Sequence, residues 1–586
     1  MYRTAIFITL LFFFLQGMAQ TPKEKIDCSG VVFDKKTDEP LAYASVYKKN
    51  TNKGTATNLS GFFKLTNIEV GDTLVISYVG YDNMLIHITN NRAANYYLSP
   101  KAKLLNEAVV YANNDFLYKK IIDLKKRKNH QIDSAKTYYY LETNIDGNTV
   151  ELIEAFFNGE YQGYDTKELY FKNSQIGLKP YKCGDDKYYF VSSETSKIFS
   201  KYTLFKKNDD FPSNPIELNK WRLKKHYELK LLSAYKDGAS KIYEVSFIPK
   251  KEKDKYFGGV VWIDLTNNYI KKIDLTIKNT QKQPFKTFGN INIIKGADIY
   301  LSKTFLLKGD NIILTSMNYD IDLTYENYNK HEYSPHIHTY IKPFDYNKKF
   351  VPSLFNFGET KYKDYRNASL TSNDSVFWCN REFYLNDSIR NELDFFNENK
   401  LSPKHRGIDF SNIANEKNKI GLLQYAFIEW DIRRFIIHEA TKNRIEEAAK
   451  RNKFNADKYN INTKLYLDIN EIHDTVYHIT KAILDPIDTY YFFKIDNRCL
   501  VFFNIYFDLL EIERRDLEEA ISQLKHKDYT SIKQLYYKSM DNYDKTIKLF
   551  VKETDRGKNQ MGLIKWNKYV YENLMINNLA YFNIVF

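Results

Sequence analysis

The sequence predicts a multidomain protein that is mainly β: an N-terminal β-sandwich, a large antiparallel β domain and a helix-rich C-terminal domain. Three observations predict this fold class. The chain has 586 residues, which is too many for one hydrophobic core. Up to about residue 346, runs rich in Val, Ile, Thr and aromatic residues alternate with turn residues. After residue 422 the apolar residues recur at helical spacing instead.

The N-terminus, residues 1–19, has the features of a secretory signal peptide. Arg3 supplies a positive charge, residues 5–15 form an apolar run, and small residues precede the expected cleavage after Ala19. The apolar run is too short to cross a membrane, and no later stretch of the sequence reaches the length that a membrane helix needs. We therefore expect an exported chain in the periplasm or associated with the outer membrane.

Residues 26–111 are expected to form the β-sandwich. Leu74, Ile76 and Tyr78 alternate with other residues, so each strand has one face to bury. About seven such strands in a short segment favour a small sandwich that covers these faces. The motifs in this segment are Gly30-x-Val32-x-Asp34, Glu39-Pro40-Leu41, Ala44-x-Val46, Gly54-Thr55-x-Thr57, Gly61-x-Phe63 and Ser77-Tyr78-Val79-Gly80-Tyr81.

These motifs resemble the carboxypeptidase-regulatory-like domain, a transthyretin-like β-sandwich of envelope proteins from Bacteroidetes-type bacteria. The resemblance implies attachment or binding, since this domain does no chemistry itself. Asn58 stands where the family usually has Asp. Both residues can close an Asx-turn, so the turn is expected but a metal role for it is not.

Residues 104–111 resemble the segment that follows the same domain in TonB-dependent receptors, where a plug and a β-barrel come next. No such plug or barrel pattern follows here, and a last strand or an extended linker is the alternative interpretation. Residues 112–135 are expected to form a helical connector. Its helix is predicted over Asp115–Asn129, with Leu117, Ile121 and Leu124 near one face and basic residues at its end.

Residues 136–346 are predicted to form a large antiparallel β domain. Asn267-Asn268 suits the tight turn of a hairpin because Asn tolerates positive φ. Residues 243–264 resemble the middle of LolA-type lipoprotein carriers, in which a curved sheet forms a half-barrel. That resemblance implies a concave face able to hold an acyl chain or a hydrophobic segment, whereas a plain antiparallel sheet is the alternative.

The last two segments are less regular. Residues 347–421 are expected to wrap as an irregular ordered connection in which Phe377 and Trp378 need cover. Residues 422–586 are predicted to be mixed and helix-rich, with a helix from Leu422 to Arg451. A charged helix is expected over Leu509–Leu524. The predictions end with a helix or broken pair from Asp541 to Met575, interrupted at Arg556-Gly557, and an alternating tail strand at 582–586.

Composition limits the partners. The formal net charge is +13, which suits anionic lipid, polysaccharide or nucleic acid, or simply a solvated surface. An exported chain has no nucleic acid to meet, so the expected partner is an envelope protein, glycan or lipid, with membrane association but no transmembrane helix. Four cysteines are expected to be mostly unpaired, buried thiols because their spacing gives no disulfide or metal pattern; they are Cys28, Cys183, Cys379 and Cys499.

No motif for catalysis or for a cofactor occurs. None of the eleven histidines begins a His-x-x-Glu motif, so a zinc carboxypeptidase site is not predicted. The weak metal candidates are His331, His336 and His338, because His336 and His338 project to the same side of a strand. A cluster of acidic residues is expected to be a solvated helix face; it comprises Glu511, Glu513, Asp516, Glu518 and Glu519.

The sequence therefore predicts a non-catalytic exported envelope protein that binds or scaffolds a protein, glycan or lipid. Two alternatives remain. One is a hydrolase of unrecognised type with its site between the β and helical domains. The other is a relative of TonB-dependent receptor components that lacks the barrel.

Overall fold

The computed structural model describes residues 25–101, 115–127, 131–354, 427–432 and 459–585, together with Leu370 and residues 375–379. Short gaps interrupt these ranges at 52, 59, 91–92, 180, 184–185, 189, 191, 252, 287–292, 328–329, 473–474, 486–488 and 492–495. The chain divides into two compact units, whose described residues run up to 101 and from 115 onward. We describe each unit by itself.

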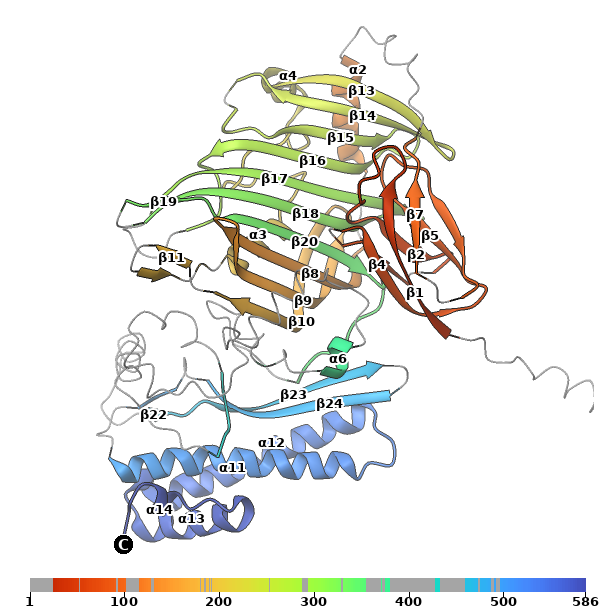
Figure 1. The fold of residues 1–586 in the computed structure, drawn as a ribbon. Coiled ribbons are helices and arrows are strands. Elements are labelled where there is room, and N and C mark those ends of the chain that lie inside the picture. The colour runs from red at the N-terminus through yellow and green to blue at the C-terminus, as the bar shows by residue number, and fades with distance from the viewer. Residues whose placement is uncertain are drawn as a thin grey trace, which may run out of the picture. The chain divides into compact units, whose positions relative to one another are not determined.

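The first unit is a β-sandwich of two sheets, with strand orders β4-β1-β7 and β3-β2-β5-β6 (Figure 1). Val32, Val46, Phe63 and Ile76 from both sheets are buried between them. The predicted Asx-turn is present, because Asn58 Oδ1 accepts the backbone N–H groups of Ser60 and Phe62. The strands are β1 (Lys25–Asp34), β2 (Ser45–Lys48), β3 (Gly54–Ala56), β4 (Phe62–Glu69), β5 (Thr73–Ser77), β6 (Met84–His87) and β7 (Ala94–Leu98).

The second unit begins with an 11-stranded antiparallel sheet, whose main path is β10-β9-β8-β20-β18-β17-β16-β15-β14-β13. Asn268 has the positive φ predicted for the hairpin turn. Its strands are β8 (Asp133–Ile145), β9 (Asn148–Gln162), β10 (Asp165–Leu178), β13 (Tyr227–Asp237), β14 (Ser240–Pro249), β15 (Gly258–Asp264), β16 (Tyr269–Thr280), β17 (Ile293–Lys308), β18 (Asn311–Glu326), β19 (Glu332–Tyr333) and β20 (His336–Phe344).

One face of this sheet, the inner face, is apolar and is covered by the chain itself. Ile299, Ile321 and Ile337 oppose one another across three strands and are buried in the largest core. Three helices supply buried side chains to the same core and lie behind the sheet in Figure 1. They are α2 (Asp115–Asp123, continued by the 3-10 turn Leu124–Lys126), α3 (Ser193–Ser200) and α4 (Lys220–His226).

The connector helix differs from its prediction. It ends at Asp123 rather than Asn129, and Leu117 and Ile121 pack into the core of the sheet. The hydroxyl of Tyr118 donates to the carbonyl of Tyr227 at 2.8 Å. The segment is therefore part of the covering of the inner face, in addition to linking the two units along the chain.

The C-terminal part packs a hairpin on helices. β23 (Thr463–Ile472) pairs with β24 (Thr475–Leu484), and both share a core with α11 (Asn497–Ser522), α12 (Tyr529–Thr554) and α13 (Gln560–Leu574). The predicted break is confirmed, because Arg556 has φ 55° and Gly557 has φ 89°. The remaining elements are β11 (Tyr181–Cys183), β12 (Asp186–Tyr188), α6 (Ser375–Cys379), β21 (Ile428–Glu429), β22 (Tyr459–Asn460), β25 (Tyr490–Tyr491) and α14 (Asn578–Tyr581).

Two predictions for this part are wrong. Ile428–Glu429, expected within a helix, is a short strand paired with Leu484 and Ile483 of β24; the rest of that predicted helix beyond 432 lies outside the described residues. The expected tail strand is absent from residues 582–585, because α14 and a turn end the described chain. Phe582 packs into the helical core instead.

Candidate functional site

The side of the large sheet opposite α2, α3 and α4, here called the outer face, carries two rows of polar side chains. The first row is Asp298, Asp322 and His336, which oppose one another on β17, β18 and β20. The second row runs from Asp320 through His338 to Glu142 on β18, β20 and β8. Opposed residues share a face, so the six side chains form one group, which we call the polar ladder: Glu142, Asp298, Asp320, Asp322, His336 and His338.

Within the ladder each histidine is held by a carboxylate. His336 Nδ1 lies 2.8 Å from Asp322 Oδ1, and His338 Nδ1 lies 2.6 Å from Asp320 Oδ1. Asp320 also lies 3.9 Å from His336 Nε2, which links the two rows. The side chain of Asp322 is 58% exposed and that of His338 is 13% exposed. The side chains of the ladder therefore range from exposed at Asp322 to largely buried at His338.

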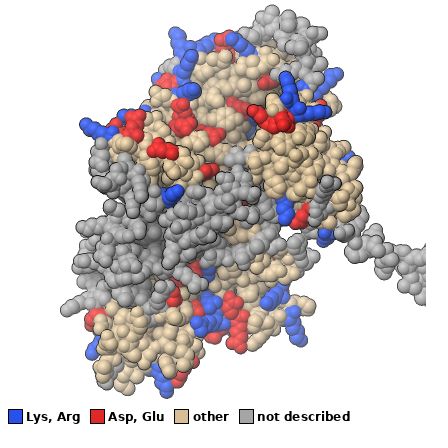
Figure 2. Space-filling view, viewed as in Figure 1, with Lys and Arg blue, Asp and Glu red and all other residues tan. Residues whose placement is uncertain are grey.

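The ladder is acidic although the chain is basic. It contains four carboxylates and no Lys or Arg. Figure 2 shows acidic side chains across the middle of this face, with lysines mainly toward its edges. A partner with positive charge is favoured by such a surface.

The third metal candidate, His331, lies directly before β19. Its backbone N–H donates to Asn327 Oδ1 at 2.9 Å. Glu332, the only nearby carboxylate evident from the sequence, pairs with Lys295 at 2.7 Å and not with a histidine. Within the ranges that the structure describes, no group of three or more His, Cys, Asp or Glu side chains is arranged to hold a metal ion.

The pair His338–Asp320 has the geometry in which a carboxylate orients an imidazole base. The base would then need a nucleophile on its other side. The cross-strand neighbours of His338 are Asp320 and Glu142, and the ring of Tyr140 lies 6.1 Å away. None of these side chains is a serine or cysteine nucleophile, so the pair does not form a hydrolytic site with them.

Toward β9 the outer face becomes buried. Glu154 and Lys342 are 0% and 6% exposed, and the hydroxyl of Tyr138 donates to Glu154 Oε1 at 3.1 Å. Burial lowers the pKa of Lys342 to about 8. The ring of Phe156 is surrounded by other rings at centroid distances of 5.2–6.4 Å, those of Phe344, Phe350, Phe377 and Trp378. Phe377 and Trp378 thus find the cover that the sequence analysis expected.

The acidic cluster on α11 is only partly a solvated face, which corrects the prediction. Glu511 is 4% exposed and accepts two hydrogen bonds from Arg514 and one from Arg515. Burial would raise the pKa of Glu518, but hydrogen bonds from His478 and Thr480 outweigh it and lower that pKa.

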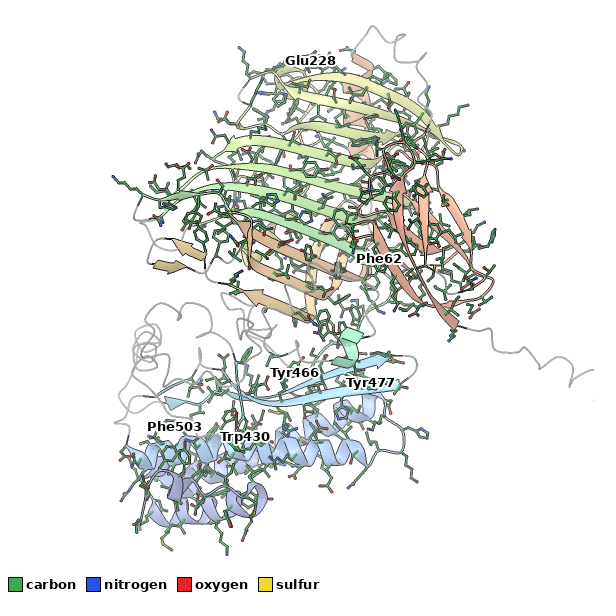
Figure 3. The ribbon with its side chains drawn as sticks, viewed as in Figure 1. Phe62, Glu228, Trp430, Tyr466, Tyr477 and Phe503 are labelled. Atoms are coloured by element: carbon green, nitrogen blue, oxygen red, sulfur yellow. The ribbon has the colours of Figure 1, made fainter. Side chains whose placement is uncertain are left out.

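The same stretch of α11 contains a second buried acid, Asp508. It accepts hydrogen bonds from Trp430 Nε1 at 2.8 Å and from Asn578 Nδ2 at 2.7 Å. Figure 3 labels Trp430 beside the helices. Asp508 and Glu518 thus tie α11 to neighbouring elements, whereas Glu511 is paired with arginines of its own helix.

Two of the four cysteines have described side chains. Cys28 is buried and Cys499 is half-buried, and neither is in a disulfide. Burial raises the pKa of both thiols, to about 11 for Cys499. The side chains of Cys183 and Cys379 lie outside the described residues.

The carboxylates of the ladder were missed by the sequence analysis. Asp320 and Asp322 alternate along the run that was predicted as a strand, and His336 and His338 alternate along the next one. Pairing these two alternations across a hairpin would have suggested the contacts, because the turn between them is short. The register that decides which residues meet is fixed only in the folded sheet.

Comparison with known proteins identifies the first unit. Residues 28–110 match the family model of the CarboxypepD_reg-like domain, which confirms the resemblance predicted from the motifs. A search of curated proteins finds none that matches the chain.

Solved structures show weak similarity to the middle of the chain, as the LolA resemblance predicted. One is an outer-membrane lipoprotein-sorting protein domain from Vibrio parahaemolyticus, with 12% identity, TM-score 0.19 and coverage of 40% of this chain and 93% of that chain. A LolA superfamily protein from Nitrosomonas europaea has 12% identity, TM-score 0.15 and coverage of 40% and 94%. The MucA/MucB complex of Pseudomonas aeruginosa has 7% identity, TM-score 0.14 and coverage of 39% of this chain and 94% of that chain.

Proposed function

We propose that this protein is a non-catalytic, exported envelope protein that uses the outer face of its large sheet to bind a protein with a basic surface. The observation that carries the proposal is the polar ladder, a partly exposed acidic group in a chain of net charge +13. Charge complementarity across an interface steers association and selects partners. An acidic surface disfavours anionic lipids and anionic glycans at this face.

The rest of the outer face fits a protein interface. Trp262 and Tyr300 are half-buried on this face, and Lys272 lies over the indole of Trp262 at 4.7 Å. Aromatic side chains are enriched in the cores of protein interfaces. The CarboxypepD_reg-like domain supports attachment or binding rather than hydrolysis, and the N-terminal sequence supports export.

A second candidate, a lipid held on the inner face, has less support. Phe199 of α3 stacks on Tyr319 of the sheet with centroids 5.1 Å apart, and Tyr202 is 1% exposed. The chain's own side chains thus occupy the space where an acyl chain would lie. We expect purified protein to carry no stoichiometric lipid by mass spectrometry, and co-purified lipid would favour this second candidate.

The proposal is tested by capture from an envelope extract on the immobilised mature chain. The triple variant D298N/D320N/D322N keeps the shapes of the side chains and removes three negative charges. We expect it to lose the captured protein, because complementary charge is lost. The matched control is D209N/D210N/D254N, which removes the same charge from exposed sites elsewhere on the sheet unit.

Capture that disappears with the ladder triple and persists with the control supports the proposal. Equal capture by the wild type and both triples would refute it. If the captured material is a glycan and not a protein, the proposed partner class is wrong and the partner is a glycan. As a check on the enzymatic alternative, His338→Ala should leave any hydrolase activity of the preparation unchanged.

A further inference from the structure

The solvent-facing side of α12 carries a stripe of basic residues. Residues three, four and seven apart share one side of a helix, and this spacing joins exposed lysines over about four turns of α12. The opposite side packs into the C-terminal core through Ile532, Tyr536, Tyr543 and Phe550. The exposed cations, here called the basic face, are Lys538, Lys545, Lys548 and Lys552.

The basic face has a clear net charge and a linear shape. Asp541 and Asp544 are exposed acidic residues within its span, and Asp541 pairs with Lys545. Lys527 precedes the helix and Lys558 follows it, and both are exposed. Since α12 has 26 residues, the stripe is about 39 Å long or less. Four lysines against two aspartates leave a net positive charge along one rigid element.

One exposed apolar side chain lies among these charges, and another follows at the start of the next helix. Leu549 is 47% exposed within the stripe, between Lys548 and Lys552 in sequence, and Met561 at the start of α13 is 72% exposed. Exposed leucine and methionine side chains do not strengthen binding to a soluble polyanion, which offers them no apolar surroundings. They do gain from entering the boundary between lipid headgroups and acyl chains, which is how amphipathic helices lie on membranes.

We propose that the basic face of α12 docks the protein on an anionic phospholipid surface. The inference deepens the proposed function, because it rests on an envelope location and adds the means of attachment. Each lysine or arginine near an anionic leaflet adds electrostatic attraction to the membrane. Salt screens this attraction beyond a distance of about 8–10 Å. Within the described residues no helix is long and apolar enough to span a membrane, and this docking needs none.

The experiment uses the mature full chain and vesicles of phosphatidylcholine with about 30% phosphatidylglycerol, or of phosphatidylcholine alone, in a flotation assay. We expect binding to the anionic vesicles only, weakened on the order of tenfold when salt rises from 0.1 to 0.5 M. K545E/K548E/K552E should abolish it. The control K251E/K253E/K255E changes the same net charge at exposed positions between β14 and β15.

A further variant separates lipid from other polyanions. Leu549→Ser should weaken vesicle binding several-fold and leave binding to heparin, a soluble polyanion, unchanged. Binding to heparin but not to vesicles overturns the proposal, as does equal loss in the two lysine triples, which would show an effect of net charge alone. Partner capture without vesicles tests only the polar ladder. A failure of the proposed function would therefore appear in the capture experiment, and a failure of membrane docking would appear in the flotation assay.

Discussion

Lys303 is a cation in the core beneath the large sheet, and its burial makes stability depend on pH. The residue is 0% exposed, and its Nζ donates to the carbonyl of Tyr202. Burial lowers its pKa from 10.5 to about 8. The unfolded chain therefore holds this proton up to about pH 10.5, whereas the folded chain loses it near pH 8.

The sign follows from linkage: this lysine destabilises the fold below pH 8, and the penalty shrinks as pH rises toward 10.5. Lys303→Met removes the titration. We expect the stability of the wild type relative to this variant to rise by about 1.4 kcal/mol per pH unit above pH 8. Urea unfolding at pH 7, 8 and 9 measures the gap, with the exposed Lys230→Met as control. A gap that is constant with pH contradicts the assignment.

Two asparagines on neighbouring strands offer a matched comparison. Asn158 of β9 exchanges hydrogen bonds with the backbone of Phe350, at 2.9 Å and 2.7 Å. Asn173 of β10 is 0% exposed, and neither its Oδ1 nor its Nδ2 has a hydrogen-bond partner among the residues that the structure describes. A buried amide without partners costs on the order of 1–3 kcal/mol.

Asn173→Leu keeps the branched side-chain shape with larger end groups, and it should therefore stabilise the protein by about 1–2 kcal/mol, less any strain of repacking. Asn158→Leu should destabilise it, because two backbone groups of Phe350 lose their partners. Thermal unfolding of both variants measures the difference. Destabilisation by both changes would show that Asn173 binds a buried water or ligand.

At the scale of elements, the sheet and the C-terminal hairpin are joined by a buried ion pair. Lys172, at a bulge of β10, lies 2.6 Å from Asp468 of β23, and the side chains are 1% and 2% exposed. Lys172 also donates to the carbonyls of Val351 and Ile469, and Ser353 donates to Asp468. The bulge lets an edge strand direct a lysine into this contact.

Breaking such a pair on one side leaves a buried charge, at a cost of about 3–5 kcal/mol. Lys172→Met and Asp468→Leu should each destabilise the protein by about that amount. The double variant should recover much of the loss, because no charge stays buried. Denaturant unfolding of the four proteins closes the double-mutant cycle, and simple additivity of the two losses would contradict the ion-pair account.

The same elements show how much the sequence predicted. Three predictions were confirmed because they depend on local sequence alone: the sandwich motifs, the Asn267-Asn268 turn and the break at Arg556-Gly557. The prediction of a helix at Ile428–Glu429 was wrong because this apolar run, although at helical spacing, pairs with β24 as a strand. Pairing of that kind depends on distant residues, and single-sequence patterns do not contain it.

The candidate site was half predictable for the same reason. His336 and His338 were placed correctly on one side of a strand, but their partners Asp320 and Asp322 belong to another strand. Glu511 reads as a surface acid because its neighbours in sequence are charged. Arg514 and Arg515, three and four residues on, hold it against the packed side of α11.

At the scale of the whole chain, we propose that two surfaces of opposite charge give the second unit two separate contacts. The polar ladder is acidic, and the basic face of α12 is positive, so a partner of a single charge sign is attracted to only one of them. A protein built in this way can hold a basic partner at an anionic membrane. Scaffolding of this kind requires simultaneous engagement and no chemistry.

The prediction for the whole chain is recruitment. In flotation with anionic vesicles, the protein captured from envelope extract should rise with the vesicles only when the mature chain is present. D298N/D320N/D322N should float without the partner, and K545E/K548E/K552E should bind the partner without floating. Because the two variants fail at different steps, mixing them should not restore recruitment. A partner that floats with the ladder variant would show that the two contacts are one surface, and recruitment by the mixture would show that separate copies of the chain can share the task.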